Sequence, residues 1–169
     1  MSEQVIPESM QPHAVRRTSR ERQELLDSSG WLREYDWRQL DTLADYFDTY
    51  VIPAGTRLFE EGDSDTYLAV VAQGRVQISK KGRQGGEQVL TTAAKGSAFG
   101  EISLIDGGRR SGSAVTLDTT TLLILRRDRF DQLMKEKPAL AAEFTLSMAR
   151  TLAGRLRKTT WVLVDYIGA

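Results

Sequence analysis

Seven short segments rich in β-branched and apolar residues follow one another through the middle of the chain, and each is separated from the next by a turn signal. The turns include Gln73-Gly74, Lys81-Gly82 and Gly85-Gly86. Many short strands at near-regular spacing are typical of a sandwich or a barrel-like roll, and not of a parallel α/β sheet. The segments that we expect to be strands are 49–53, 56–59, 67–72, 75–79, 88–92, 113–117 and 121–125.

Helical patterns flank this β-rich middle. Apolar residues recur three or four positions apart in 37–47, and again from Asp128 until Pro138. A longer helix is expected to begin at Pro138, because proline is favoured at the first helical position, and to run through the apolar stripe of Leu140, Phe144, Met148, Leu152 and Leu156. We therefore expect a mainly β fold with flanking helices: a double-stranded β-helix or jelly roll with one N-terminal and two C-terminal helices.

The composition excludes several classes of function. Lys plus Arg and Asp plus Glu both number 23, so no overall field draws the chain to nucleic acid or to an anionic membrane. There is no cysteine and only one histidine, His13, which lies outside the predicted roll. A metal-dependent enzyme of the cupin type is therefore disfavoured, because such sites draw mainly on imidazole ligands. We expect no catalytic site, no metal, no direct nucleic-acid binding, no membrane segment and a cytoplasmic protein.

The N-terminal part is polar and contains a basic cluster. We expect residues 1–34 to form a mobile segment and residues 35–169 to form the folded domain, including the C-terminal helices. Within the mobile segment, Arg16-Arg17-Thr18-Ser19 resembles the signal that basophilic kinases recognise. A plain solvated basic cluster is the favoured interpretation, because matches of four residues arise often by chance.

One segment, Phe99 to Ser111, combines charged side chains with several glycines that indicate turns. It carries the carboxylate of Glu101 and the guanidinium groups of Arg109 and Arg110. Arginine presents a planar fork of donors that matches a phosphate edge, whereas a carboxylate repels phosphate unless it faces another part of the ligand, such as a sugar hydroxyl. A sugar phosphate satisfies both kinds of group.

The order of elements, together with two motifs, resembles the cyclic nucleotide-binding domain family of catabolite activator protein and kinase A regulatory subunits. The first motif covers two hairpins with glycines at their turns, in 52–55, 59–63 and 73–76. The second is the phosphate-binding cassette, in which Phe-Gly-Glu is followed by a short loop and then by Arg with Ser, here 99–111. The resemblance covers roughly residues 35–160.

The resemblance implies a role for each cassette residue. Gly100 would give the backbone room beside the ligand, and Glu101 would begin one helical turn, 101–105, whose amides face the cyclic phosphate. Glu101 would also accept a hydrogen bond from the ribose 2′-hydroxyl; as an alternative, it is a carboxylate favoured by the helix dipole. Arg110, in preference to Arg109, would meet the exocyclic phosphate oxygens. The other expected site residues are Ile102, Ser103, Ser111 and Gly112.

Three of these assignments stay open at this stage. Ser103 is as well explained by packing as by a ligand contact, and Ser111 leaves the choice between cAMP and cGMP undecided. Gly112 stands where relatives usually carry alanine, which suggests a less rigid cassette. In the last helix, Thr159, Thr160 and Trp161 would cover the base, or instead belong to tail packing or a dimer seam.

The implied function is a regulatory module that binds cAMP or cGMP without a metal. It would signal through its C-terminal helices to a separate effector protein, with a homodimer as the expected assembly. Two alternatives remain: a docking domain of the same fold that binds no mononucleotide, and a domain that accepts a cyclic dinucleotide.

Overall fold

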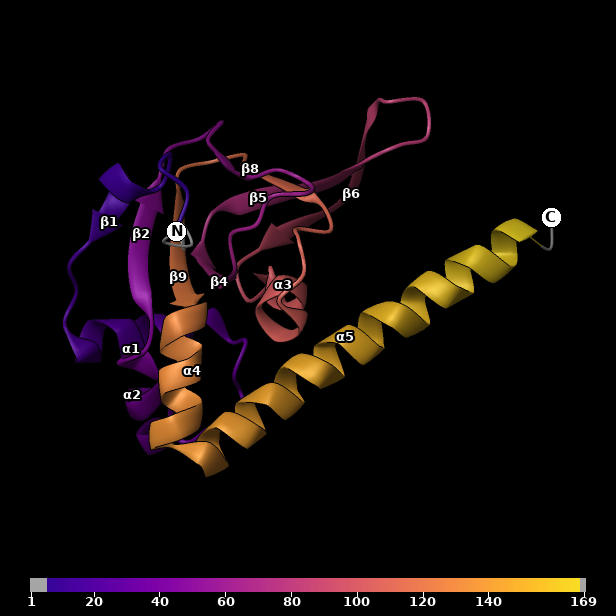
Figure 1. Ribbon diagram of the computed structural model, residues 1–169. Coiled ribbons are helices and arrows are strands. Elements are labelled where there is room, and N and C mark those ends of the chain that lie inside the picture. Colours follow the sequence, from indigo (N-terminus) through magenta and orange to yellow (C-terminus); the bar gives the residue numbers. More distant parts are fainter. Residues whose placement is uncertain (1–5, 168–169) are drawn as a thin grey trace. The chain divides into compact units, whose positions relative to one another are not determined.

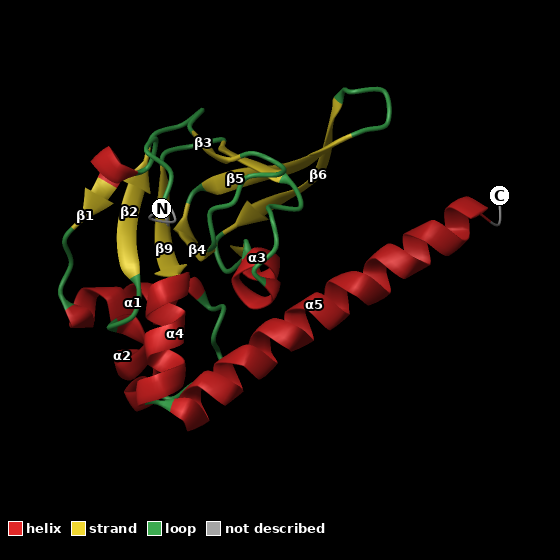
Figure 2. Cartoon of the chain, viewed as in Figure 1, coloured by secondary structure: helices red, strands yellow, loops and turns green. Residues whose placement is uncertain are grey.

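A computed structural model describes residues 6–167, and the chain divides into two compact units, 1–130 and 131–169. In the first unit, nine strands form two antiparallel sheets among the described residues (Figure 1, Figure 2). One sheet has the order β1 (Ala14–Val15), β2 (Asp48–Ile52), β9 (Thr120–Arg126), β4 (Tyr67–Gln73) and β7 (Ala98–Phe99). The other has the order β3 (Arg57–Phe59), β8 (Ser113–Thr116), β5 (Arg75–Lys81) and β6 (Glu87–Ala94).

This arrangement confirms the jelly roll. Most neighbours in the two sheets come from distant parts of the sequence, as in the pairing of β2 with β9, where Tyr50 faces Leu122. Strand β4 lies inside its sheet between β9 and β7, and only its last residue is exposed. A fully buried strand of this kind reads as a continuous apolar run, which is why Tyr67 to Ala72 has no polar alternation.

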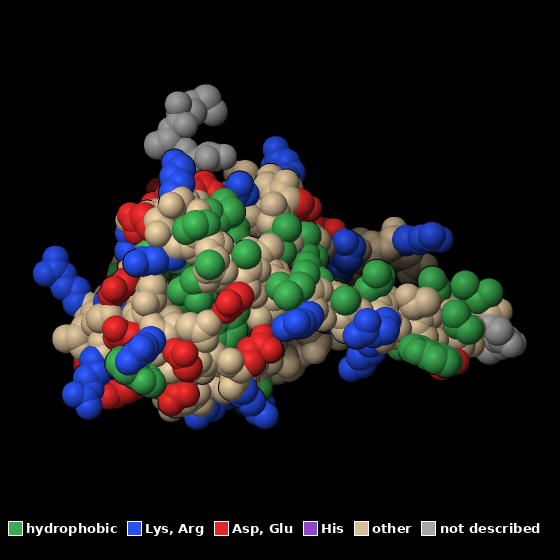
Figure 3. Space-filling model, turned by 90° about the horizontal axis from the view of Figure 1, so that it is seen from below, with side chains coloured by type: hydrophobic (Ala, Val, Ile, Leu, Met, Phe, Trp, Pro, Cys, Tyr) green, Lys and Arg blue, Asp and Glu red, His purple; other side chains and the backbone are tan. Residues whose placement is uncertain are grey.

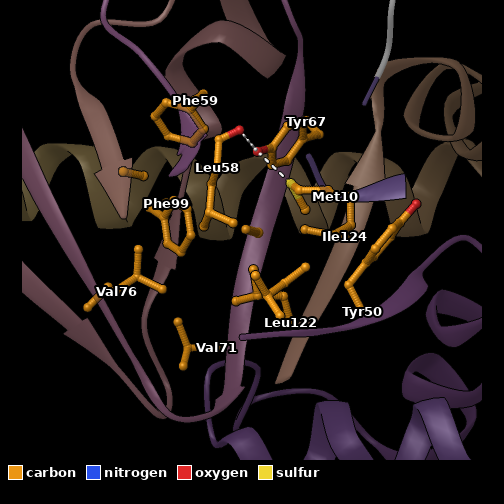
Figure 4. Packing of buried hydrophobic residues seen from close by; sticks show 14 of the residues in the cluster. Met10, Tyr50, Leu58, Phe59, Tyr67, Val71, Val76, Phe99, Leu122 and Ile124 are labelled. Atoms are coloured by element: carbon orange, nitrogen blue, oxygen red, sulfur yellow. Dashed lines mark hydrogen bonds between the residues drawn. The ribbon is translucent and has the colours of Figure 1, made fainter. Parts of the chain in front are cut away.

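The core of the roll is an apolar cluster contributed by both sheets (Figure 4). Burying a large apolar side chain stabilises a fold by about 1.5–3 kcal/mol, so this cluster is the main support of the first unit. Its members are Ile6, Met10, Tyr50, Ile52, Leu58, Phe59, Tyr67, Ala69, Val71, Val76, Ala93, Phe99, Ala114, Leu122 and Ile124.

Two helices precede β2, where the sequence predicted one. Helix α1 (Ser19–Ser29) begins with a capping box formed by Thr18 and Glu21, in which each side chain bonds the other residue's backbone. Helix α2 (Trp37–Ala44) begins with an equivalent box. It ends three residues before the predicted boundary at Phe47, because Asp45 and Tyr46 form a turn and β2 begins at Asp48.

The prediction of a mobile segment over 1–34 is wrong for its described part, 6–34. Ile6 and Met10 are buried in the core, and residues 11–13 form the short 3-10 helix η1. Strand β1 then pairs with β2 through Ala14 and Val15. The polar composition of this segment concealed the few apolar residues that hold it in place. These residues are sufficient to order the segment because they pack against apolar side chains of the roll. Residues 1–5 lie outside the described part.

The second unit is helical. Helix α4 (Arg127–Glu136) begins at the end of the first unit, and α5 (Pro138–Ile167) starts at the predicted proline. Helix α5 extends well past Leu156, where its predicted apolar stripe ended. Exposed apolar side chains are dense along its far end (Figure 3). They are Leu156, Trp161, Val162, Leu163, Val164, Tyr166 and Ile167.

Candidate phosphate-binding site

Gly100 fixes the point at which the chain enters the short helix α3 (Glu101–Asp106). Its φ is 82°, a conformation that favours glycine. A Cβ atom here would lie 2.6 Å from both the Tyr67 carbonyl oxygen and Arg110 Nη1, so no other residue fits. Helix α3 is one residue longer than the predicted turn, and Gly100 stands at its N-cap position.

Arg110 is buried beside this helix, with 3 % of its surface exposed. Its Nη1 donates to the Tyr67 carbonyl at 3.0 Å, to the Gly100 carbonyl at 3.2 Å and to Ser103 Oγ at 2.9 Å. Two of these acceptors belong to the cassette itself. The guanidinium therefore ties the start of α3 to β4, and the predicted site residues Gly100, Ser103 and Arg110 come together.

The main chain of Arg110 is held as firmly as its side chain. Its amide donates to the Asp63 carbonyl at 2.9 Å, and its carbonyl accepts from the Gly62 amide at 2.8 Å. The turn after β3 therefore pairs with the end of the cassette loop. This pairing joins the turn at Gly62, from the first sequence motif, to the cassette, which is the second.

A carboxylate that the sequence analysis missed completes the environment of Arg110. Asp65 Oδ2 accepts from Nη2 at 2.8 Å and from Nε at 3.1 Å, and both side chains are almost fully buried. Burial raises the pKa of Asp65, while the charge of Arg110 acts in the opposite direction. The available signal in the sequence was an aspartate two positions before an apolar strand, because a carboxylate that is buried beside such a strand requires a partner.

Two aromatic rings, inclined by 71° to each other, pack against the guanidinium. The Arg110 Cζ atom lies 4.1 Å from the ring centre of Phe59 and 4.2 Å from that of Tyr67. A cation over an aromatic face is attracted to its negative quadrupole, most strongly where water is excluded. Burial raises the pKa of the Tyr67 phenol, which keeps this group neutral. The rings therefore restrict the orientation of the guanidinium from two directions, and neither ring carries a charge.

Glu101 is the first residue of α3 and is buried, with 3 % of its surface exposed. It lies in sequence between the two cassette residues that contact Arg110. Ser103 is also buried, and its hydroxyl donates to the Gly100 carbonyl at 3.3 Å, so packing and hydrogen bonding within the cassette account for this residue. Ile102, in contrast to Glu101 and Ser103, is exposed over 40 % of its surface.

Ser111 and Gly112 form the other end of the cassette. Ser111 is exposed, and its carbonyl accepts from Lys80 Nζ at 3.0 Å. A Cβ atom on Gly112 would lie 2.7 Å from the Ser79 carbonyl oxygen. Close approach of β5 therefore explains the glycine, and the expectation of a less rigid cassette is not needed to account for it.

Other predicted residues lie elsewhere. Arg109 is exposed and donates to the Gly62 carbonyl at 2.8 Å. The hydroxyls of Thr159 and Thr160 donate to carbonyls of their own helix, those of Arg155 and Leu156. These threonines and Trp161 belong to the second unit, and their role as a cover for the base stays a prediction.

The basic motif near the N-terminus has a structural explanation. Thr18 caps α1, and the Ser19 hydroxyl donates to Asp45 Oδ1 at 2.6 Å. Arg17 lies 3.6 Å from Glu21 on the next turn of the helix. Side-chain contacts within the first unit therefore account for the motif.

Two kinds of feature are absent from the described residues. Within 6–167, no group of three or more His, Asp and Glu side chains is arranged to hold a metal ion. No helix in that range is long and apolar enough to cross a membrane.

An open groove of about 540 Å³ lies along α4 and α5 and includes Met134, Leu146 and Thr145 in its lining. It has no charged group in its lining, so it does not suit a phosphate.

Comparisons with known proteins identify the family to which the chain is similar. Residues 50–137 match the family model described as the cyclic nucleotide-binding domain. The cyclic AMP receptor protein of Thermus thermophilus is 35 % identical over 114 residues, which cover 68 % of this chain and 53 % of that protein. A CRP-like cAMP-activated global transcriptional regulator of Mycobacterium tuberculosis is 28 % identical over 144 residues, 85 % of this chain and 62 % of that protein.

A solved structure resembles nearly the whole chain. The crystal structure of a cyclic nucleotide-binding domain from Methylobacillus flagellatus has a TM-score of 0.79 and 27 % identity, and the match covers 92 % of this chain and 88 % of that one. The chain spans between half and two thirds of the length of the two curated relatives. Since the family model matches more than half of it, the chain belongs to the cyclic nucleotide-binding domain family, a family of regulatory domains.

Proposed function

We propose that this chain senses cAMP through the cassette at Gly100 to Gly112. The cyclic phosphate binds at the N-terminus of α3, where backbone amides without partners in the helix face the anion. Arg110 supplies the positive charge, and Glu101 accepts a hydrogen bond from the ribose 2′-hydroxyl. Ile102, Ser103, Ser111 and Gly112 shape the remainder of the pocket.

The observation that carries this proposal is the buried Arg110, which contacts the cassette on one side and Asp65 on the other. Because its surroundings already exclude water, a phosphate oxygen gains a charge-assisted bond without a further desolvation penalty on the arginine. The phosphate competes with Asp65 for the same donors. Ligand binding therefore exchanges one anion for another at Arg110.

The proposed nucleotide is cAMP and not cGMP. The names of the two curated relatives refer to cAMP, and their similarity extends over most of this chain. A serine at position 111 is compatible with either base. We therefore expect cAMP to bind more tightly than cGMP, with the ribose contact to Glu101 common to both.

The output passes through the C-terminal helices. A ligand shifts a conformational equilibrium only if it binds one arrangement more tightly than the other. We propose that α4 and α5 differ between two such arrangements, and that α5 also joins two copies of the chain into a homodimer. A separate effector protein then reads the state of the dimer.

Isothermal titration calorimetry with cAMP, cGMP and cyclic di-GMP tests the proposal. Saturable binding of cAMP at one site per chain, tighter than that of cGMP, is the expected result. If only cyclic di-GMP binds, the ligand is a cyclic dinucleotide and the proposal of cAMP is wrong. If no compound binds, the fold serves here as a docking domain.

A further inference from the structure

The N-terminal segment, residues 6–15, contributes Ile6 and Met10 to the core cluster that contains Tyr67, a neighbour of Arg110. We propose that Met10 in this segment is a positioning residue for the phosphate site. Acting through Tyr67, it holds the guanidinium of Arg110 in the plane that the ligand requires. The N-terminal segment is then part of the sensor and sets its affinity.

The first link joins Met10 to Tyr67. Met10 is fully buried, and its Sδ atom lies 3.3 Å from the Tyr67 hydroxyl, within hydrogen-bonding distance (Figure 4). The same hydroxyl lies 3.3 Å from the Leu58 carbonyl oxygen. The end of the phenol ring is therefore held between a strand of the opposite sheet and the N-terminal segment.

The second link joins Tyr67 to Arg110. The ring face lies 4.2 Å from Arg110 Cζ, and the Tyr67 carbonyl accepts from Nη1 at 3.0 Å. Phe59, whose ring centre lies 4.1 Å from the same Cζ atom, also contacts the Tyr67 ring edge to face, with 6.0 Å between centres. A tilt of the Tyr67 ring would therefore alter the contacts of both rings with the guanidinium.

Several contacts hold the segment in place. Ile6 belongs to the same core cluster, and the Ser9 hydroxyl donates to the Arg57 carbonyl at 3.0 Å, one residue before Leu58. Farther along, Ala14 pairs with Tyr50 in the β1 to β2 ladder. The segment is thus attached to both sheets, to β3 through Ser9 and to β2 through Ala14.

The chain of contacts has a functional consequence. Deleting the Met10 side chain opens a cavity beside the phenol, and well-packed neighbours relax only partly into such a space. The ring gains room to tilt, and the guanidinium loses its fixed orientation. A bidentate hydrogen bond from arginine to phosphate depends on the orientation of the planar guanidinium, whereas the attraction between phosphate and a point charge does not.

The test compares Met10→Ala with Leu26→Ala in the full-length chain. Leu26 is equally buried, but it lies on α1 outside the core cluster that contains Tyr67. We expect Met10→Ala to weaken cAMP binding by at least about fivefold and Leu26→Ala by less than about twofold. Equal losses in both variants would show a general effect of destabilisation and would overturn the proposal.

A double-mutant cycle shows whether the effect passes through Arg110. Arg110→Lys keeps a charge beside Asp65 but lacks the planar group that lies on Tyr67. In this background Met10→Ala is expected to change affinity by less than about twofold. An undiminished effect would contradict the role of Met10. Met10→Leu, which keeps the packing, should restore binding in the parent background.

The inference rests on the proposed function, so a second measurement is independent of any nucleotide. In the parent, the Arg110 Nε–H resonance should be shifted upfield by the two rings and should exchange slowly with solvent. Met10→Ala should reduce the upfield shift and accelerate the exchange, whereas Leu26→Ala should not. If cAMP does not bind but this result holds, the proposed function fails and the positioning role stands.

A milder variant covers the case in which Met10→Ala does not fold. Ile6→Ala removes a neighbouring part of the same segment and is expected to weaken cAMP binding by about two- to threefold, again only when Arg110 is present. Unchanged binding and an unchanged Arg110 Nε–H resonance in this variant would overturn the proposal.

Discussion

Arg110 is bound to the protein through both edges of its guanidinium, so its replacement affects the fold as well as the ligand. Arg110→Ala should weaken cAMP binding by about 1.5–3 kcal/mol, the range for hydrogen bonds to a charged group. The variant also leaves the buried Asp65 carboxylate without its partner, which destabilises a fold by about 3–5 kcal/mol.

The double variant Asp65→Ala/Arg110→Ala separates the two effects. It removes both buried charges, so chemical denaturation should recover much of the stability that Arg110→Ala loses. Calorimetry should show that binding stays weak, because the arginine is still absent. Parent-like affinity in the double variant would remove Arg110 from the proposed site.

Competition between Asp65 and phosphate makes binding depend on pH. Since burial raises the pKa of Asp65, its carboxyl takes up a proton at a higher pH in the folded chain than in the unfolded chain. Protonation of Asp65 therefore contributes to the free energy of unfolding at low pH, and this contribution is lost as the pH rises through the raised pKa of Asp65. A protonated Asp65 competes weakly for Arg110, whereas the cyclic phosphate stays anionic.

We therefore expect cAMP affinity to rise as the pH is lowered into the range in which Asp65 takes up a proton, a range that burial moves upward from that of an ordinary aspartate. Calorimetry across this range measures the effect, and Asp65→Asn serves as the control in which the rise should disappear. An affinity that falls on acidification would contradict the competition.

Glu101 is buried at the start of α3, where its proposed partner is the ribose 2′-hydroxyl. Glu101→Gln replaces a charged acceptor by a neutral one, so discrimination between cAMP and 2′-deoxy-cAMP should narrow by about 1 kcal/mol. Parallel titrations of both nucleotides measure the ratio. A ratio equal to that of the parent would leave Glu101 with only its place near the helix dipole.

At the same scale, the sequence predicted part of the site and missed part. Gly100, Ser103 and Arg110 come together as the motif suggested, because they belong to one continuous segment. Asp65 lies 45 positions before Arg110, and nothing local in the sequence identifies it as the partner. The roles of Phe59 and Tyr67 were hidden for the same reason, since an apolar run predicts burial but not what lies on each ring.

At the level of elements, the pairing of β5 with β8 places a limit on position 112. Gly112→Ala would put a Cβ atom 2.7 Å from the Ser79 carbonyl oxygen, so the two strands must separate. We expect a loss of about 1–3 kcal/mol in the free energy of unfolding, the range for overpacking a close contact. Urea denaturation measures it, and unchanged stability would show that β5 moves aside readily.

The strands themselves were predictable where they are long. The seven expected segments all fall on observed strands, with boundaries shifted by one or a few residues. Strands β1 and β7 were missed, because two residues are too short to show a period of two. Helix α1 was missed because its sequence is polar, although the capping box of Thr18 and Glu21 was a local signal for its start.

For the whole molecule, the exposed apolar end of α5 determines the expected assembly. Leu156 and Leu163 lie seven residues apart and are 69 % and 53 % exposed, the spacing of a helix that packs on a second helix. Replacing both by glutamate should convert a dimer into a monomer in light scattering coupled to size-exclusion chromatography. A parent chain that is already monomeric at high concentration would contradict the proposed dimer.

The tight fit around Gly100 also bears on attempts to change ligand preference by laboratory evolution. A library that randomises the whole cassette would lose most of its members at this position, since any side chain there meets Arg110 and Tyr67. Diversity is better placed at Ile102 and Ser111, whose exposed side chains leave room for new shapes. Selection would then act on exposed positions of the cassette, while the close contact between Gly100 and Arg110 stays unchanged.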